Sequence, residues 1–505
     1  MREMTAADLI QATGGKLLWG HEDTKVRHIS LDSRNMEGDD LFVPIIGEKV
    51  DAHRFICQAI GQGAAAVFTS RHHSAAEVMA AIGEQCADAG DRKDQAEGAG
   101  AQKDQTKEAG DAGARRAQAA AWIEVEDTVK ALQDVGAYCR KGRKIPLVGI
   151  TGSVGKTTTR EMIAAALSAG FTVYKTPGNS NSQVGVPVTI AEIPEDAQIG
   201  VIELGMSEPG EMTRIARVAQ VDCAVMTNIG VTHIEQLGSR ENILKEKLHI
   251  QDGMAPEGIL FLNGDDVMLK DVQAAEGRRR ILYGLADHCQ YRGENLHLEN
   301  GYPVFTAVHE DERVLVRLKV MGSHMVGNAL AALAVAGEYG IPMEKAAARL
   351  EEFEGFKGRQ QIFTVGGVTV IDDSYNASPV SMKAGLEVLC SMDTAGRKIA
   401  VLADMKELGP GAPGFHREIG AYIAEHPVDR LVLLGGLAAE IGHELSKLAP
   451  GIPVEYCDDL DQITGWLGEH LMPGDCVLFK GSNSMKLSRA VNDMKENGKN
   501  ISPEG

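Results

Sequence analysis

The sequence has no long apolar run, no CxxC cysteine pair and no excess of basic residues. Because a membrane-spanning helix needs about 18 or more apolar residues in a row, we expect no membrane insertion. The N-terminal MREMTAADLIQATGG lacks the apolar core of a signal peptide, which predicts a cytoplasmic protein. The eight cysteines are scattered and show no zinc-ligand spacing.

The charge balance excludes another class of partner. Lys and Arg number 51 against 71 Asp and Glu, which leaves a net charge of −20. Such an acidic surface argues against a nucleic-acid partner. With 44% apolar and 24% charged residues, the composition is that of an ordinary globular protein.

One segment differs from the rest in composition. Residues 87–120 contain no Val, Ile, Leu, Met, Phe, Tyr, Trp or Cys, so they have nothing to bury and are predicted to form a flexible surface insertion. The rest of the chain is predicted to form three domains, residues 1–144 (which carry the insertion), 145–357 and 358–505.

Apolar strands alternate with helical segments through most of the chain. Before the insertion the predicted strands are LFVPI (41–45) and AAAVFTS (64–70). After it they are KIPLVGI (144–150), IGVIELG (199–205), DCAVMTNIG (222–230), GILFLN (258–263), GVTVIDDS (367–374), KIAVLAD (398–404), RLVLLGG (430–436) and CVLFKGS (476–482). Residues 325–350 are alanine-rich and predicted helical. This alternation predicts an α/β fold with mostly parallel sheets, whose ligands bind at the carboxyl ends of strands.

A glycine-rich loop, GITGSVGKTTTRE (149–161), joins one of these strands to a helix. Its amides and the helix N-terminus favour phosphate, Lys156 would neutralise the phosphates, and the Thr157 hydroxyl would hold Mg²⁺. Position 150 is Ile where a glycine is usual, so Gly152 and Gly155 form a shortened loop. The residues assigned to ATP here are Thr151, Gly152, Ser153, Val154, Gly155, Lys156, Thr157 and Thr158. Kinase, motor, switch and ligase all remain open at this point.

Further polar residues follow the later strands. Glu203 ends one strand, His233 follows the next, and a helix that begins near Ser239 carries Lys245 and Lys247. A carboxylate and an imidazole near a nucleotide can hold Mg²⁺. The two lysines face different sides of the helix, and spacing alone cannot choose between them.

These motifs, in this order, resemble the Mur ligase family over nearly the whole chain. Besides the phosphate loop, the matching segments are DSRNMEGDDLFVPIIGEKVDAHRF (32–55), GNSNSQVGVP (178–187), IELGMSEPGEM (202–212), TNIGVTHIEQLGSRENILKEK (227–247), DSYNASPVSM (373–382), ADMKELG (403–409) and KGSNSMKL (480–487). The resemblance is to the branch that adds D-alanyl-D-alanine to UDP-N-acetylmuramoyl-tripeptide through an acyl phosphate. It implies a UDP-binding domain, a central ATP-binding domain, a Rossmann-like C-terminal domain, ATP and Mg²⁺ as cofactors, and a monomer.

The resemblance also implies roles for single residues. Lys156, His233, Lys247 and Arg359 would be catalytic. Thr157, Glu203, His233 and a carbamylated Lys247 would hold metal. Asn328 would contact the adenine, Arg359 the γ-phosphate, and Asp373 and Tyr375 the ribose. Ser33 and Arg34 would bind UDP, Asn179 and Asn181 the muramoyl end, and Asn376 and Ser378 the acceptor.

The sequence differs from the family pattern at four positions, and other functions were considered. Met325, Ser378, His249 and Ala52 stand where the family usually has Asn, Asn, an acidic residue and Gly. A ligase that adds the third residue is disfavoured because no arginine follows the proline of NASPVSM, and a folate ligase is disfavoured by the DSR and GNSN motifs. A P-loop kinase or NTPase would turn over ATP without any amino-acid acceptor.

Overall fold

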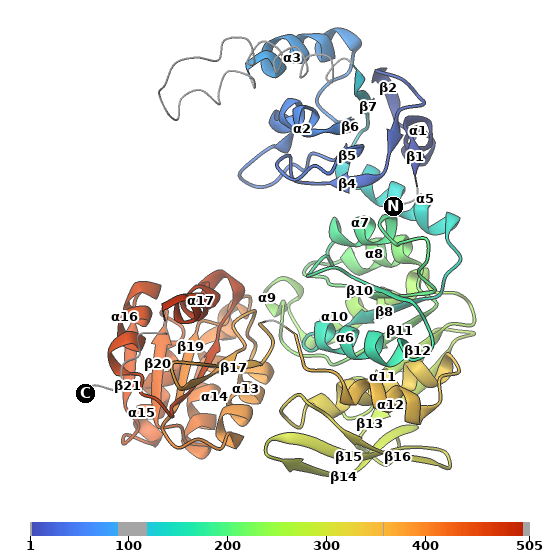
Figure 1. Ribbon diagram of the computed structural model, residues 1–505. Helices are drawn as coiled ribbons and strands as arrows, with labels where there is room; N and C mark the ends of the chain where they lie inside the picture. The colour runs from blue at the N-terminus through green and yellow to red at the C-terminus, as the bar shows by residue number, and fades with distance from the viewer. Residues whose placement is uncertain (1–2, 89–118, 357, 498–505) are drawn as a thin grey trace. The chain divides into compact units, whose positions relative to one another are not determined.

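The computed structural model describes residues 3–88, 119–356 and 358–497 (Figure 1). The chain forms two compact units. The first comprises Met1–Leu147, Thr176–Leu204 and Thr213–Val221, and the second comprises Val148–Lys175, Gly205–Met212 and Asp222–Gly505. Three larger sheets with their helices confirm the predicted α/β class, whereas the predicted domain boundaries stay predictions. The predicted insertion at 87–120 falls almost entirely outside the described residues.

A five-stranded sheet forms near the N-terminus of the chain. Its strands, in spatial order, are β2 (Lys16–Trp19), β7 (Ala121–Glu124), β6 (Ala64–Thr69), β5 (Asp40–Phe42) and β4 (His28–Ser30). All neighbours are parallel except β2 and β7. The remaining elements are α1 (Ala6–Thr13), η1 (Ala52–Phe55), α2 (Ile56–Gln62), α3 (Ala75–Asp88), α5 (Thr128–Gly142) and the strand pair β1 (Met4–Thr5) and β3 (Lys25–Val26). Successive residues Trp122 and Ile123 belong to different core clusters, since side chains alternate across a strand.

A nine-stranded sheet occupies the middle of the chain. In spatial order it contains β16 (Glu312–Arg317), β15 (Tyr302–His309), β14 (Tyr291–Glu299), β13 (Arg279–Gly284), β12 (Ile259–Asn263), β11 (Cys223–Met226), β8 (Leu147–Thr151), β10 (Ile199–Glu203) and β9 (Val173–Lys175). Strands β8, β11, β12, β13 and β14 run parallel, and β14 to β16 form an antiparallel meander that the sequence analysis missed.

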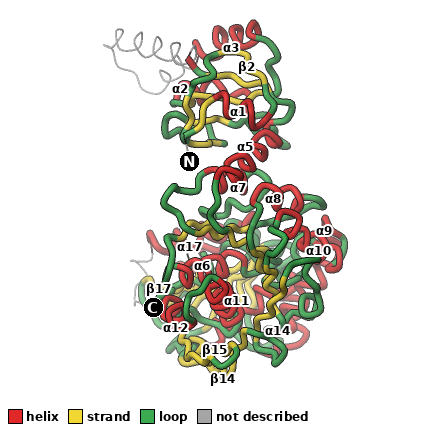
Figure 2. Tube along the Cα trace, turned by 90° about the vertical axis from the view of Figure 1, so that its right-hand side faces the viewer, coloured by secondary structure: helices red, strands yellow, loops and turns green. Residues whose placement is uncertain are grey.

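The helices of this region differ in length. They are α6 (Lys156–Leu167), α7 (Gly185–Ala191), α8 (Glu211–Ala219), α9 (Ile234–Leu237), α10 (Arg240–Leu248), η3 (His249–Gly253), α11 (Met325–Glu338) and α12 (Met343–Glu351). The two central ones, α6 and α11, are buried over most of their residues. Helices α6 and α11 lie side by side (Figure 2). The segment 325–350, which was predicted to be helical, forms the two helices α11 and α12, which are separated because Gly340 has a left-handed φ of 76° and Pro342 cannot continue a helix.

The C-terminal sheet has six strands. In spatial order they are β17 (Gln361–Val365), β18 (Val368–Asp372), β22 (Cys476–Lys480), β19 (Lys398–Ala403), β20 (Arg430–Leu434) and β21 (Val454–Cys457). Only the β17–β18 pair is antiparallel. The helices around it are α13 (Pro379–Ser391), η4 (Gly409–Gly411), α14 (Ala412–Glu425), α15 (Ala439–Leu448), α16 (Leu460–His470), η5 (Asn483–Met485) and α17 (Leu487–Asn497).

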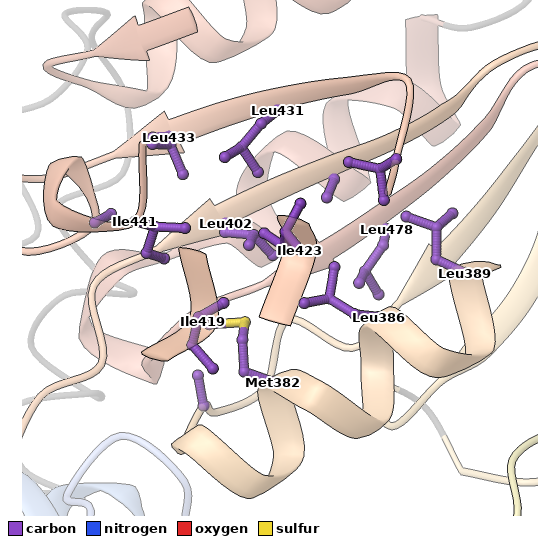
Figure 3. Close-up of a cluster of buried hydrophobic side chains, with 14 of the residues drawn as sticks. Met382, Leu386, Leu389, Leu402, Ile419, Ile423, Leu431, Leu433, Ile441 and Leu478 are labelled. Carbon is purple, nitrogen blue, oxygen red and sulfur yellow. The ribbon is translucent and has the colours of Figure 1, made fainter. Parts of the chain in front are cut away.

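Each face of this sheet has its own core. Leu402 and Leu478 point to the face covered by α13, α14 and α15, where they meet Met382 and Leu386 (Figure 3). The neighbouring strand residues, such as Val401, point to the opposite face, which α16 and α17 cover. Burial of each such aliphatic side chain stabilises the fold by roughly 1.5–3 kcal/mol. Both faces are therefore closed, and the strand ends are left to carry polar residues. Among the described residues, no helix has the length and apolar character to span a membrane.

Candidate functional site

The predicted phosphate loop connects β8 to α6 as expected. Gly155, with a left-handed φ of 85°, is the residue before the helix. At Gly152 a Cβ atom would lie 1.9 Å from Thr227 Oγ1, so only glycine fits. The Lys156 ammonium folds back and donates to the Gly152 carbonyl at 2.8 Å. The buried hydroxyl of Thr157 follows in the first turn of α6. The loop therefore needs glycine at both positions, and Lys156 closes over it.

Residues after the neighbouring strand β11 brace this loop. Val154 donates its backbone N–H to Asn228 Oδ1 (2.9 Å), and its carbonyl accepts from Asn228 Nδ2 (3.1 Å) and from the Thr227 hydroxyl (2.6 Å). Gly230 donates to the Ser153 hydroxyl at 2.9 Å. The sequence analysis did not assign Thr227 or Asn228. The feature that could have identified these two residues is their position directly after β11, which lies parallel to β8.

A second lysine lies beside the same carbonyl. Lys247, on α10, is 1% exposed, and its ammonium donates to the Gly152 carbonyl at 3.2 Å. Burial, together with the nearby Lys156 cation, lowers the pKa of Lys247 well below its usual value. Lys245 is exposed on the other side of the helix. Of the two lysines that spacing could not separate, Lys247 is therefore the one buried beside the phosphate loop.

The other predicted metal ligands have protein partners of their own. Glu203 is buried and accepts from Asn181 Nδ2 at 2.8 Å, and Asn181 also donates to Asn179 Oδ1 at 3.0 Å. His233 Nδ1 lies 2.6 Å from Glu407 Oε2, and this contact lowers the pKa of Glu407. Among the described residues, no group of three or more His, Cys, Asp or Glu side chains is placed to hold a metal ion.

The chemistry of the donor set decides whether Mg²⁺ fits. Mg²⁺ takes oxygen ligands, so the Thr157 hydroxyl is suitable. Lys247 as an amine is not suitable, but as a carbamate it would offer two oxygens. The residues of the phosphate loop and of α10 would therefore fit a magnesium ion only if CO₂ added to Lys247.

Asn328, whose contact with the adenine stays a prediction, bonds to a neighbouring helix. It is on α11, and its Oδ1 accepts from the Thr159 hydroxyl of α6 at 2.9 Å. A Cβ atom on Gly155 would lie 3.4 Å from the same oxygen. Its amide nitrogen donates to the Met325 sulfur at 3.6 Å, so Met325 fills the place of the usual asparagine with a weak acceptor.

A polar cluster forms at the carboxyl ends of β18 and β22. Lys480, 2% exposed, donates to Asp373 Oδ2 (2.5 Å) and to the Asn376 carbonyl (3.1 Å). The Arg359 guanidinium stacks on the Tyr375 ring at 4.2 Å. Burial lowers the pKa of Lys480, and the Asp373 carboxylate opposes this shift. Three predicted nucleotide residues, Arg359, Asp373 and Tyr375, are thus brought together with a lysine that the sequence analysis did not assign.

The predicted acceptor residues also serve the local fold. Ser378 is the N-cap of α13, where its hydroxyl accepts from the Ser381 amide at 3.4 Å. Asn376 Oδ1 accepts from the Ala377 amide at 2.9 Å. Neither bond tests a role in acceptor binding, which stays a prediction.

In the N-terminal sheet, the predicted UDP-binding loop follows β4. The Ser33 hydroxyl donates to Gln58 Oε1 at 3.2 Å. Arg34 donates to both oxygens of Asp32, which lowers the pKa of Asp32 to about 2. This loop therefore presents an anchored hydroxyl and an exposed guanidinium at the carboxyl end of a parallel strand.

Ala52, which departs from the family pattern, leaves the contacts of its two neighbours intact. Asp51 and His53 flank the alanine that replaces a usual glycine. His53 Nδ1 lies 2.6 Å from Asp51 Oδ1, and its Nε2 accepts from the Ser70 amide at 3.1 Å. The imidazole is therefore held at both nitrogens in spite of Ala52.

Three family models match successive parts of the chain. The Mur ligase middle domain matches residues 150–336, the Mur ligase glutamate ligase domain residues 358–483, and the catalytic domain of the Mur ligase family residues 25–137. The UDP-N-acetylmuramoyl-tripeptide--D-alanyl-D-alanine ligase of Bacillus subtilis is 33% identical, covering 94% of each chain. The ligase of the same name from Escherichia coli is 28% identical, covering 99% of this chain and 100% of its own.

Solved structures give the same result. A crystal structure of MurF from Acinetobacter baumannii matches with a TM-score of 0.81 at 27% identity, covering 98% of this chain and 100% of its own. The MurF ligase of Thermotoga maritima in complex with ADP matches with a TM-score of 0.75 at 25% identity, covering 94% of this chain and 99% of its own.

Proposed function

This chain belongs to the Mur ligase family, and we propose that it joins D-alanyl-D-alanine to UDP-N-acetylmuramoyl-tripeptide while converting ATP to ADP and phosphate. The observation that carries the proposal is the similarity over nearly the full length to ligases with this activity, together with an intact phosphate loop that ends in Lys156 and Thr157. The product would be the muramoyl-pentapeptide precursor of peptidoglycan.

The reaction divides into two displacements. The terminal carboxylate of the tripeptide attacks the γ-phosphorus of ATP, which forms an acyl phosphate and releases ADP. The amine of D-alanyl-D-alanine then attacks the acyl carbon, loses a proton, and the tetrahedral intermediate expels phosphate to leave an amide. Because two anions must approach each other in the first step, Lys156 and Arg359 would offset their charge. The main task of the protein is therefore to align three ligands.

Magnesium would bind at the phosphate loop. When bound, Mg²⁺ would neutralise charge on the transferred phosphate. Thr157, His233 and a carbamylated Lys247 would be ligands, and Glu203 is carried over as a further ligand from the family resemblance. The support for carbamylation is chemical, since the burial of Lys247 lowers its pKa and so favours the neutral amine, which is the form that adds CO₂.

The remaining assignments also stand as proposals. For the nucleotide we assign Asn328 to the adenine, Asp373 and Tyr375 to the ribose, and Arg359 to the γ-phosphate. For the substrates we assign Ser33, Arg34, Asn179 and Asn181 to the UDP-muramoyl part and Asn376 and Ser378 to the acceptor. Support comes from their placement, since most of them follow the carboxyl end of a strand, where α/β folds bind ligands.

Two properties of the whole protein complete the proposal. We expect it to act in the cytoplasm, where ATP and UDP-activated sugars are made. We also expect a monomer, which sedimentation or light scattering of the purified protein would check.

The test is phosphate release by purified protein with ATP, UDP-N-acetylmuramoyl-tripeptide and D-alanyl-D-alanine, with each component omitted in turn. We expect release only with all three, and a product heavier than the tripeptide by one dipeptide residue. Sustained release without the dipeptide would point instead to an NTPase or a kinase. Release with a single amino acid in place of the dipeptide would indicate another branch of the family.

A further inference from the structure

Strand β22 has an ion pair at each of its ends, and the pair at its carboxyl end is buried on both sides. At its carboxyl end Lys480 donates to Asp373 Oδ2 at 2.5 Å. Just before its first residue, Asp475 accepts from Arg397 Nη2 at 2.6 Å. The parallel register pairs Asp372 with Phe479, so the next residues, Asp373 and Lys480, emerge side by side although 107 positions separate them. Strand pairing therefore creates the Lys480 contact.

The Lys480 ammonium holds two points of the loop that joins β18 to α13, residues 373–378. Besides Asp373, it donates to the Asn376 carbonyl at 3.1 Å. The loop receives further support from Asn483 Nδ2, which donates to the Tyr375 carbonyl at 3.2 Å. Helix α13 closes the site, since a Cβ atom on Gly385 would lie 3.2 Å from Lys480 Cδ. The loop is thus fixed by a buried side chain that solvent does not reach.

A buried ion pair is a poor source of stability, because desolvation of both ions offsets most of their attraction. We therefore look for the role of the buried Lys480–Asp373 pair in the geometry that it imposes on the loop. The two ends of β22 differ in this respect. Arg397 is partly exposed, and its pair closes a turn remote from every predicted ligand contact. Lys480 instead holds the carboxylate and the loop that carry the predicted ribose contacts, Asp373 and Tyr375.

We propose that Lys480 is a positioning residue for nucleotide binding. It fixes the direction of the Asp373 carboxylate and the path of residues 373–378, and thereby places Tyr375 as the platform on which Arg359 stacks. The proposal rests on the proposed function, because it assumes that this cluster binds the nucleotide. In this proposal Lys480 orients the Asp373 carboxylate and the loop, and it does not itself contact the reacting atoms.

The test compares Lys480→Met with Arg397→Met, which breaks the ion pair at the other end of the same strand. We expect Lys480→Met to weaken ADP binding, measured by calorimetry, by about tenfold or more, since the loop loses a charge-assisted hydrogen bond. It should raise the KM for ATP more than it lowers kcat, as expected when binding common to ground and transition states is lost. Arg397→Met should lower the melting temperature and leave ADP binding within about threefold of wild type.

Two outcomes would overturn the proposal. One is ADP binding by Lys480→Met that matches that of Arg397→Met. The other is a kcat that falls with an unchanged KM for ATP. If Lys480→Met does not fold, Lys480→Gln decides in its place, because its neutral amide can give Asp373 and the Asn376 carbonyl only weaker hydrogen bonds than the ammonium gives, so ADP binding should still weaken. Wild-type affinity in Lys480→Gln would equally reject the proposal. Failure of the wild-type protein itself to bind ADP would instead overturn the nucleotide site, and with it the proposed function.

Discussion

Lys247 and Lys480 are the same residue type, almost equally buried, and yet their surroundings differ. Lys480 faces the Asp373 carboxylate at 2.5 Å. Lys247 donates to the Gly152 carbonyl and lies near a second cation, Lys156, and within the described residues no ion pair holds it. A buried ammonium with a carboxylate keeps its charge and can fix a loop, whereas one beside another cation is driven towards the neutral amine. The role of a buried lysine is therefore set by the group nearest to its ammonium and not by burial alone.

The largest expected effect concerns the reactivity of Lys247. Lys247→Arg keeps a cation but cannot form a carbamate, so phosphate release in the complete ligase assay should fall about a thousandfold, in the range seen when a group that stabilises the transition state is lost. Lys245→Arg on the exposed side of α10 is the matched control and should retain wild-type turnover. An active Lys247→Arg enzyme would remove the distinction between the two buried lysines.

The second prediction contrasts the stability of methionine variants. Lys480→Met leaves Asp373 buried without its partner, so the free energy of unfolding should fall by about 3–5 kcal/mol. Lys247→Met removes a desolvated amine and leaves no carboxylate behind, so we expect a change within about 1 kcal/mol or a gain. Urea unfolding of both variants measures the difference. Equal losses would mean that the two environments are energetically alike.

The third prediction concerns pH. The folded-state pKa of Lys247 lies below its unfolded value, so between the two values the unfolded chain binds a proton that the folded protein lacks. Stability from this group therefore rises with pH in that window. Relative to Lys247→Met, the wild-type free energy of unfolding should rise by up to about 1.4 kcal/mol per pH unit as the pH approaches the ordinary lysine pKa of about 10.4 from below. Parallel pH profiles for the two proteins would contradict the assignment.

The smallest effect concerns the hydrogen bonds by which Asn228 braces Val154 in the phosphate loop. Asn228→Ala removes two hydrogen bonds that hold Val154, so the phosphate loop should loosen and ADP binding weaken by about fivefold, as for roughly 1 kcal/mol. Gln290→Ala is the control, because it removes a similar bond to the Leu282 amide away from the loop. Similar ADP affinities for the two variants would show that the Asn228 brace has no bearing on the site.

Much of the fold followed from local pattern. Strands such as 144–150 and 398–404 were predictable because apolar runs are buried on both faces of a parallel sheet. The helix start at Ser239 was predictable too, since its hydroxyl accepts from the Asn242 amide. The meander β14 to β16 was missed because its strands carry many charged residues, such as Glu294 and Arg313, which pair with each other on the sheet surface.

The sequence by itself determined where the phosphate loop lies, which strands end in polar residues, and which family the chain belongs to, because these depend on neighbours in the chain and on motif order. Only the tertiary structure decided that Lys247 and not Lys245 is buried, that Asn228 braces Val154, and that Lys480 pairs with Asp373. The reason is physical: strand register and helix packing bring together groups from distant parts of the chain, and partner and burial, not residue type, set the charge and the role of each lysine.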